Sequence, residues 1–129
     1  MTAEPDTRLL AGLRILVVED MLHIAWEMCD ELRTAGATIV GPTGQLDLAL
    51  DLAGREPIDA AVLDVALNGQ TAAPLAEALR QRNLPFVLVS GYGAEHLPPA
   101  MSGAPLLTKP VAYPRLVQAL LEADARTET

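Results

Sequence analysis

The sequence has little of three things on which whole classes of protein depend: cysteine, basic charge and long hydrophobic runs. Its single cysteine, Cys29, cannot form an internal disulfide, which excludes a disulfide-stapled secreted domain and favours a reducing compartment. Nine Lys and Arg residues against seventeen Asp and Glu give a net charge of −8, which repels nucleic acids and anionic membranes. No apolar run approaches the ~20 residues of a membrane span, and the N-terminus lacks the basic start of a signal peptide. We therefore expect a soluble, cytoplasmic protein that binds neither nucleic acid nor membrane.

What the chain does have is enough apolar side chains to fill one core. Half of its 129 residues are hydrophobic and only 20% are charged, a balance that excludes disorder of the whole chain. A chain of this length is expected to form one domain. We expect that domain over residues 13–125, with a flexible extension over residues 1–12 and a flexible end over residues 126–129.

Short apolar runs alternate along the chain with segments of helical periodicity. The runs are continuous, as is typical of strands covered on both faces. They predict five strands, at residues 14–18, 38–41, 60–63, 85–89 and 105–108. Apolar residues at steps of three and four predict helices near residues 22–32, 46–53, 72–79 and 113–121. A short helix near residues 94–97 is expected in the Gly- and Pro-rich stretch before the fifth strand. The alternation predicts an α/β fold, a doubly wound five-stranded parallel sheet.

Charged and polar residues follow the predicted strands where each strand ends. Glu19 and Asp20 follow the first strand, Asp64 the third, Ser90 the fourth and Lys109 the fifth. Because the carboxyl ends of parallel strands meet at one edge of a sheet, these side chains are expected to converge there. The spacing is regular, with 44 residues from Asp20 to Asp64 and 45 from Asp64 to Lys109.

Three carboxylates in one cleft repel one another and need a cation. An acidic, all-oxygen site suits Mg²⁺ or Mn²⁺. A lysine and a hydroxyl facing such a site are the groups that surround a phosphoryl group in proteins. The glycine-rich loop of nucleotide-binding domains is missing, because Glu19 and Asp20 stand where it would begin. A phosphoryl group at this site would therefore be covalently attached or donated.

Each of these residues also has an ordinary structural interpretation, which stays open at this point. Glu19, Asp20 and Asp64 would also serve as caps or dipole partners of the helices that follow them. Serine is a common turn residue, and a single lysine is a usual surface residue. Their shared position, each at the end of a strand, favours the functional interpretation.

Four segments resemble the motifs of two-component response-regulator receiver domains. In the order and spacing of that family they are Ile-Leu-Val-Val-Glu-Asp (15–20), Ala-Val-Leu-Asp (61–64), Val-Ser-Gly (89–91) and Thr-Lys-Pro (108–110). The resemblance extends over about residues 14–122. It implies the flavodoxin-like receiver fold, in which the five parallel strands lie in the order 2-1-3-4-5.

The resemblance implies a metal site and a phosphorylation site. Asp20 and Asp64 would bind Mg²⁺ or Mn²⁺ directly, together with the backbone carbonyl of Ala66, and Glu19 would act mainly through a bound water. Asp64 would be the phosphoacceptor, and Lys109 would pair with the phosphoryl oxygens. Three further groups would donate hydrogen bonds to the phosphoryl group: the hydroxyl of Ser90, which would be the switch residue, and the backbone N–H groups of Ala66 and Gly91.

The segment Pro-Phe-Val-Leu-Val-Ser-Gly-Tyr (85–92) is similar to a motif of stand-alone receivers common in alphaproteobacteria. Those receivers lack the usual aromatic switch residue of the fifth strand, and Leu106 agrees with that. Tyr92 would then be the aromatic switch residue, with a half-buried packing tyrosine as the alternative. Ala66 and Asn68 depart from the residues that receivers often have there, which bears on metal affinity and phosphoryl lifetime.

The sequence thus predicts a single-domain response regulator. A histidine kinase or histidine phosphotransfer protein would phosphorylate Asp64, and the output would be contact with a downstream protein or drainage of phosphate from a phosphorelay. Such a protein is not a conventional enzyme, although it catalyses its own aspartyl phosphorylation and dephosphorylation. The alternatives are a phosphorylation-independent adaptor, or pseudo-receiver, and the receiver portion of a longer chain. Trp26, in the first predicted helix, is interpreted mainly as a packing residue. The alternative, which the resemblance implies, is a place on the face where receivers meet the phosphotransfer helices of the kinase.

Overall fold

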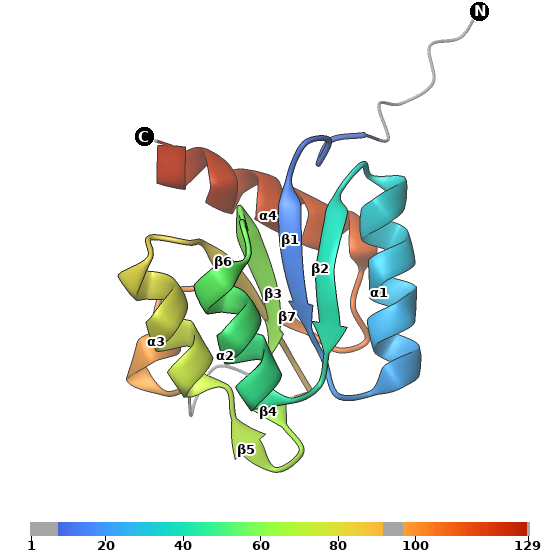
Figure 1. Cartoon of the computed structure of the whole chain (residues 1–129). Coiled ribbons are helices and arrows are strands. Elements are labelled where there is room, and N and C mark those ends of the chain that lie inside the picture. The colour runs from blue at the N-terminus through green and yellow to red at the C-terminus, as the bar shows by residue number, and fades with distance from the viewer. Residues whose placement is uncertain (1–7, 92–96, 129) are drawn as a thin grey trace, which may run out of the picture.

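A parallel sheet divides the molecule into two layers of helices (Figure 1). The computed structural model describes residues 8–91 and 97–128. The five strands of the sheet are β1 (Arg14–Val18), β2 (Thr38–Thr43), β3 (Ala60–Asp64), β6 (Phe86–Ser90) and β7 (Leu106–Thr108). Their order is β2-β1-β3-β6-β7, and every neighbouring pair is parallel. Counted within this sheet, that is the order 2-1-3-4-5, so the predicted fold is confirmed.

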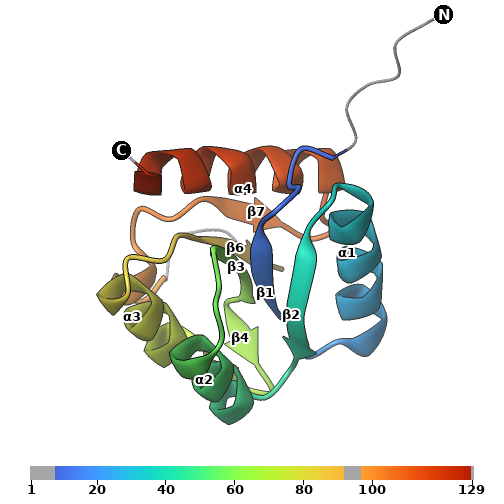
Figure 2. The same cartoon turned by 45° about the horizontal axis from the view of Figure 1, so that its top comes forward.

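Helices cover both faces of the sheet (Figure 2). On one face lie α1 (Leu22–Thr34) and α4 (Tyr113–Glu128), and on the other lie α2 (Leu46–Arg55), α3 (Ala73–Gln81) and the 3₁₀ turn η2 (Pro99–Met101). The four helices predicted from apolar periodicity are all present, and α4 is longer than its apolar pattern indicated. Among the described residues, none of the helices combines the length and the apolar character needed to cross a membrane.

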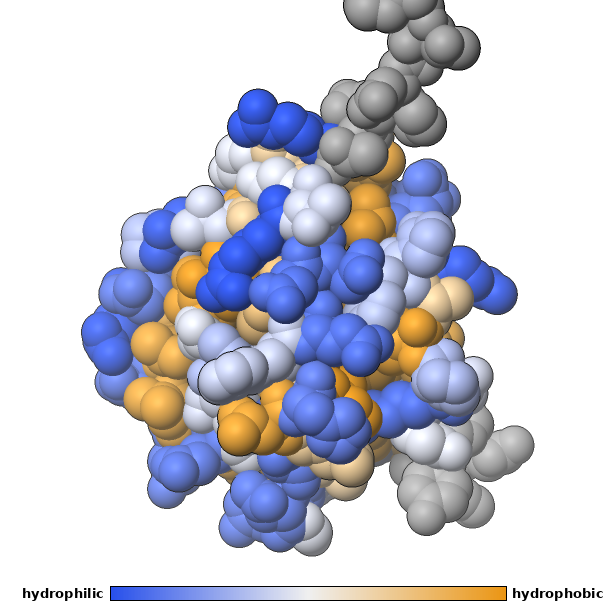
Figure 3. All heavy atoms as spheres, turned by 90° about the vertical axis from the view of Figure 1, so that its right-hand side faces the viewer, coloured by the Kyte–Doolittle hydropathy of each residue, from blue (hydrophilic) through white to orange (hydrophobic). Residues whose placement is uncertain are grey.

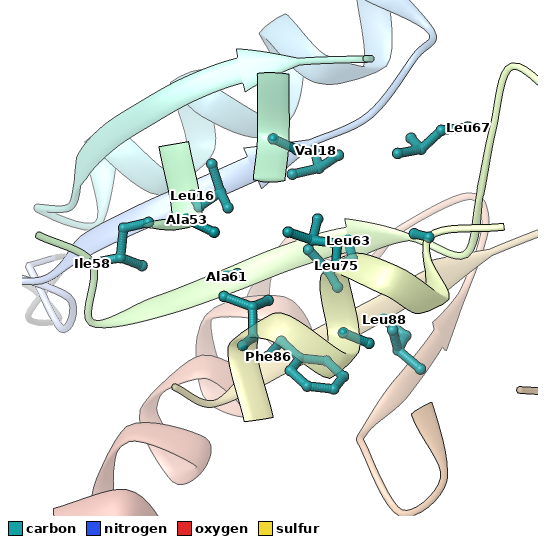
Figure 4. Packing of buried hydrophobic residues seen from close by; sticks show 14 of the residues in the cluster. Leu16, Val18, Ala53, Ile58, Ala61, Leu63, Leu67, Leu75, Phe86 and Leu88 are labelled. Atoms are coloured by element: carbon teal, nitrogen blue, oxygen red, sulfur yellow. The ribbon is translucent and has the colours of Figure 1, made fainter. Parts of the chain in front are cut away.

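The continuous apolar runs of the strands supply two separate cores. In β1, Leu16 and Val18 point to the α2/α3 side, whereas Ile15 and Val17 point to the α1/α4 side. Figure 4 shows the first of these cores, where strand side chains pack beneath α2 and α3. A strand buried on both faces needs apolar residues at every position, which explains the pattern in the sequence.

A small hairpin after β3 was not predicted from the sequence. Its strands are β4 (Ala66–Leu67) and β5 (Gln70–Thr71), which pair antiparallel. The turn between them is Asn68-Gly69, with φ of 49° and 81°. Asn-Gly is a favoured dipeptide of two-residue hairpin turns because both of its residues tolerate positive φ.

The short helix expected at residues 94–97 lies almost entirely outside the described residues.

Candidate functional site

Three acidic side chains meet at the carboxyl edge of the sheet. Glu19 and Asp20 follow β1, and Asp64 is the last residue of β3. Because β1 and β3 pair in parallel, with Val18 opposite Leu63, the residues beyond these positions lie next to each other. One carboxylate oxygen from each acid lies within 4.8 Å of the others. Glu19 and Asp64 are buried, at 2% and 6% exposure.

Lys109 comes from the outermost strand of the sheet and adds a positive charge to this cluster. It follows β7, and its Nζ lies 2.8 Å from Asp64 Oδ2 and 2.8 Å from Glu19 Oε1. Partial burial alone lowers the pKa of Lys109, but its contacts with Asp64 and Glu19 raise it above the ordinary value. The ammonium group therefore stays charged. Lys109 is also the only lysine of the chain.

One ammonium group does not neutralise the whole cluster. Burial raises the pKa of Glu19 to about 7, helped by the nearby Asp64 and opposed by Lys109 and the Met21 N–H. Glu19 Oε1 is fully buried, and despite its ion pair with Lys109 it accepts no well-directed hydrogen bond from the described part of the chain. The site thus holds a buried carboxylate whose charge a single ammonium group only partly offsets.

Asp20 differs from Glu19 because it is held as an anion. Partial burial raises its pKa. The backbone N–H of Asn68, 2.8 Å from Asp20 Oδ2, the contacts with Glu19 and with its own backbone N–H, and the charge of Lys109 together outweigh this, so the pKa lies below its ordinary value. The side chain of Asn68 also donates to the Gly44 carbonyl oxygen at 3.1 Å. Sequence reasoning noted Asn68 only as a departure from the residue that receivers often have there, and it did not place Asn68 or Gly44 in the site.

The donor set fits a hard divalent cation. It consists of three carboxylates with close oxygens, one of them a buried oxygen without a well-directed hydrogen bond. Mg²⁺ and Mn²⁺ prefer such oxygen ligands. Ala66 donates its N–H to Asp64 Oδ1 at 3.2 Å, which helps to orient that carboxylate. The role expected of the Ala66 carbonyl stays a prediction.

The other predicted residues follow β6 at the same edge. Ser90 ends β6 and is buried, and its carbonyl accepts a hydrogen bond from the Lys109 N–H at 2.8 Å. Gly91 is exposed, and a Cβ built there would meet no atom of residues 8–91 or 97–128 within 4 Å. Tyr92 lies outside the described residues, and its switch role stays a prediction.

The packing interpretation of Trp26 is wrong. Its side chain is 64% exposed on α1, one turn along from Leu22, which is 66% exposed. Met21, at the start of the helix, is also exposed. Figure 3 views the α1 side, where hydrophobic residues interrupt a mostly hydrophilic surface. Because Met21 directly follows Asp20, these exposed apolar residues begin beside the acidic cluster.

Solved structures with a similar fold include a response regulator receiver domain protein and a sensor protein. A CheY-like response regulator receiver domain protein from Methanospirillum hungatei JF-1 has a TM-score of 0.80 and 23% identity, over 90% of this chain and 96% of that one. A sensor protein from Polaromonas sp. JS666 has a TM-score of 0.78 and 27% identity, over 90% and 98% of the two chains.

A longer protein also matches, over part of its length. The response regulator PhyR from Brucella abortus has a TM-score of 0.77 and 26% identity, over 95% of this chain but 51% of its own. No protein-family model and no curated protein matches the sequence. The structural matches show that the chain has the CheY-like receiver fold.

Proposed function

We propose that the protein is a response-regulator receiver that accepts a phosphoryl group on Asp64 from a histidine kinase or a histidine phosphotransfer protein. One observation carries this proposal. In a fold shared with receiver domains, Lys109 bridges the buried carboxylates of Asp64 and Glu19 at the carboxyl edge of the sheet. Parallel α/β sheets bind ligands at that edge, and an ammonium beside an acidic cluster suits phosphoryl transfer.

Asp64 is the nucleophile in this mechanism. Lys109 and the Ala66 N–H hold its two oxygens, so that the carboxylate has a fixed orientation. A carboxylate oxygen attacks the phosphorus of the donor's phosphohistidine, and a P–O bond forms as the P–N bond breaks. The electron pair of that bond stays on the imidazole nitrogen, which takes up a proton, and Asp64 becomes an acyl phosphate.

Lys109, Ser90 and two backbone N–H groups stabilise the transferred group. Lys109 keeps its charge because its pKa is raised, and it can pair with a phosphoryl oxygen in place of Asp64 Oδ2. The Ser90 hydroxyl and the N–H groups of Ala66 and Gly91 would donate to the remaining oxygens. In the proposed switch, Ser90 moves toward the phosphoryl group and Tyr92 reports the change.

Mg²⁺ or Mn²⁺ would be held by Asp20, Asp64 and the Ala66 carbonyl, with Glu19 acting through a water. When bound, the ion neutralises the negative charge that builds up during phosphoryl transfer. The three carboxylates outnumber the one ammonium group of Lys109, so the cluster keeps a negative charge that attracts a cation. Support for this site comes from the close oxygens and from the buried Oε1 of Glu19.

The donor protein is proposed to dock on the exposed apolar residues at the start of α1. Leu22 and Trp26 are about two-thirds exposed, and Met21 lies between them and Asp20 in the sequence. Large apolar side chains that remain exposed beside a site favour contact with another protein. Output would follow through a phosphorylation-dependent contact with a downstream protein or through drainage of phosphate from a relay.

The test is intact mass after incubation with acetyl phosphate, with and without Mg²⁺. We expect a Mg²⁺-dependent gain of one phosphoryl group in the wild type and none in Asp64→Ala. Asp30→Ala, which changes an exposed aspartate of α1, is the matched control and should gain the group as the wild type does. Phosphorylation of Asp64→Ala to the wild-type extent would overturn the assignment of the phosphoacceptor.

A wild-type protein that gains no phosphoryl group would favour the second candidate, a phosphorylation-independent adaptor. The exposed Leu22 and Trp26 favour such an adaptor independently, because they suit protein contact whether or not Asp64 reacts.

A further inference from the structure

The tip of the β4–β5 hairpin joins three segments that are far apart in the sequence. The backbone N–H of Asn68 donates to Asp20 Oδ2 at 2.8 Å, across 48 residues. Its side-chain Nδ2 donates to the Gly44 carbonyl oxygen at 3.1 Å, across 24 residues. Through these two bonds the hairpin tip is tied both to the acidic cluster and to the loop that leads from β2 into α2.

Asparagine suits both of these contacts. Asn68 has a φ of 49°, in the left-handed region that few residues other than glycine adopt and that asparagine tolerates. Its amide supplies the donor that reaches Gly44, which glycine at this position would lack. The residue thus forms the turn and anchors it at the same time.

Gly44 lies close against the backbone of Asp20. A Cβ built on Gly44 would lie 2.6 Å from the Asp20 Cα and 3.1 Å from its Cβ, a space that no side chain fits. The preceding residue, Thr43, accepts a hydrogen bond from the Glu19 N–H at 3.0 Å. The backbone at Asp20 is therefore held by the β2–α2 loop, and its carboxylate is held by the hairpin.

We propose that Asn68 is a positioning residue of the acidic site, which fixes the carboxylate of Asp20 before a cation arrives, with Gly44 as its support. This inference rests on the proposed function. A carboxylate accepts several hydrogen bonds, so one N–H leaves other lone pairs free for an ion. Because the side chain is already held in one orientation, it loses less freedom when the ion binds.

The test compares two asparagine-to-glycine variants at positive φ. Asn68→Gly removes the bond to Gly44, keeps the charge of the site and suits the turn. Asn83→Gly is the matched control, because Asn83 has a φ of 57° at the end of α3, where it is exposed. Binding of Mn²⁺ alone is measured from the electron paramagnetic resonance signal of the free ion. We expect Asn68→Gly to bind roughly 10-fold more weakly and Asn83→Gly to bind as the wild type does.

A second measurement needs no metal. In the metal-free wild type, the residue-68 amide should be more strongly protected from hydrogen exchange, relative to its rate in an unfolded peptide of the same sequence, than the same amide is in Asn68→Gly. Equal Mn²⁺ binding by wild type and Asn68→Gly, or equal protection at residue 68, would overturn the positioning role while leaving the proposed function intact. A wild type that binds no Mn²⁺ would instead overturn the metal site of the proposed function, and this inference with it.

Discussion

Glu19 combines deep burial with a charge that is only partly compensated. Its carboxyl group has a pKa of about 7 in the folded protein, mainly because it is removed from water. An unfolded chain would give it a value near 4.5. Between these two values the folded protein binds more protons than the unfolded chain, so its stability must fall as the pH rises.

We expect the metal-free protein to lose stability as the pH rises from about 5 to 8. The loss attributable to Glu19 is on the order of 2–3 kcal/mol, since each unit of pKa difference corresponds to about 1.4 kcal/mol. Urea unfolding with a chelator present, at both pH values, measures it. Asp20 does not add to this slope, because its pKa is lowered and it titrates in more acidic solution.

Glu19→Gln is the control for that measurement, because it keeps the shape of the side chain and removes its titration. The variant should show a clearly flatter pH dependence than the wild type. If the two proteins lose the same stability between pH 5 and 8, the slope arises from other groups and the assignment to Glu19 is wrong.

In the loop between β2 and α2, Gly44 has no room for a side chain. We expect Gly44→Ala to destabilise the protein by about 1–3 kcal/mol, because its Cβ would overlap the Asp20 backbone. Gly54→Ala is the matched control, since Gly54 lies inside α2 and a Cβ there meets nothing within 4 Å. That variant should be more stable by about 0.5–1 kcal/mol. Urea unfolding of both variants is the measurement, and a Gly44→Ala protein as stable as the wild type would contradict the tight fit.

The five strands of the parallel sheet were predictable from the sequence, and the two-residue strands of the hairpin were not. The strand at Arg14–Val18 was predicted with its observed bounds, because a short, continuous apolar run flanked by polar residues is typical of a strand that is buried on both faces. The strands of the hairpin, Ala66–Leu67 and Gln70–Thr71, contain two residues each, too few to show a periodicity. For that element the Asn-Gly turn was the only available signal.

Taken over the whole molecule, the parallel sheet explains why part of the site was predictable. Once the strands are known to be parallel, Glu19, Asp64 and Lys109 must lie at one edge. Contacts made by loops follow no such rule. The bond from Asn68 to Asp20 depends on how a hairpin folds back over the sheet, and the exposure of Trp26 depends on the orientation of α1.

Binding of a cation should stabilise the whole domain. At a Mg²⁺ concentration ten times the dissociation constant, the gain is about 1.4 kcal/mol, which for a domain of this size raises the melting temperature by roughly 4–6 °C. Thermal unfolding with increasing MgCl₂ measures it. Asp20→Asn should lose the rise, whereas Asp30→Asn, on the exposed side of α1, should keep it. An undiminished rise in Asp20→Asn would show that Mg²⁺ acts elsewhere.

The only lysine of this chain lies in its acidic site, with 19% of its side chain exposed and two ion pairs at 2.8 Å. Apart from the terminal amine, every amine-directed reagent therefore has a single target. Its modification rate becomes a direct chemical reporter of the site, and we expect it to be slow in the folded protein because the ammonium stays protonated and paired. Peptide mapping after acetylation, across a titration with Mg²⁺ or with phosphodonor, would follow each change of Lys109 partners without any substitution in the chain.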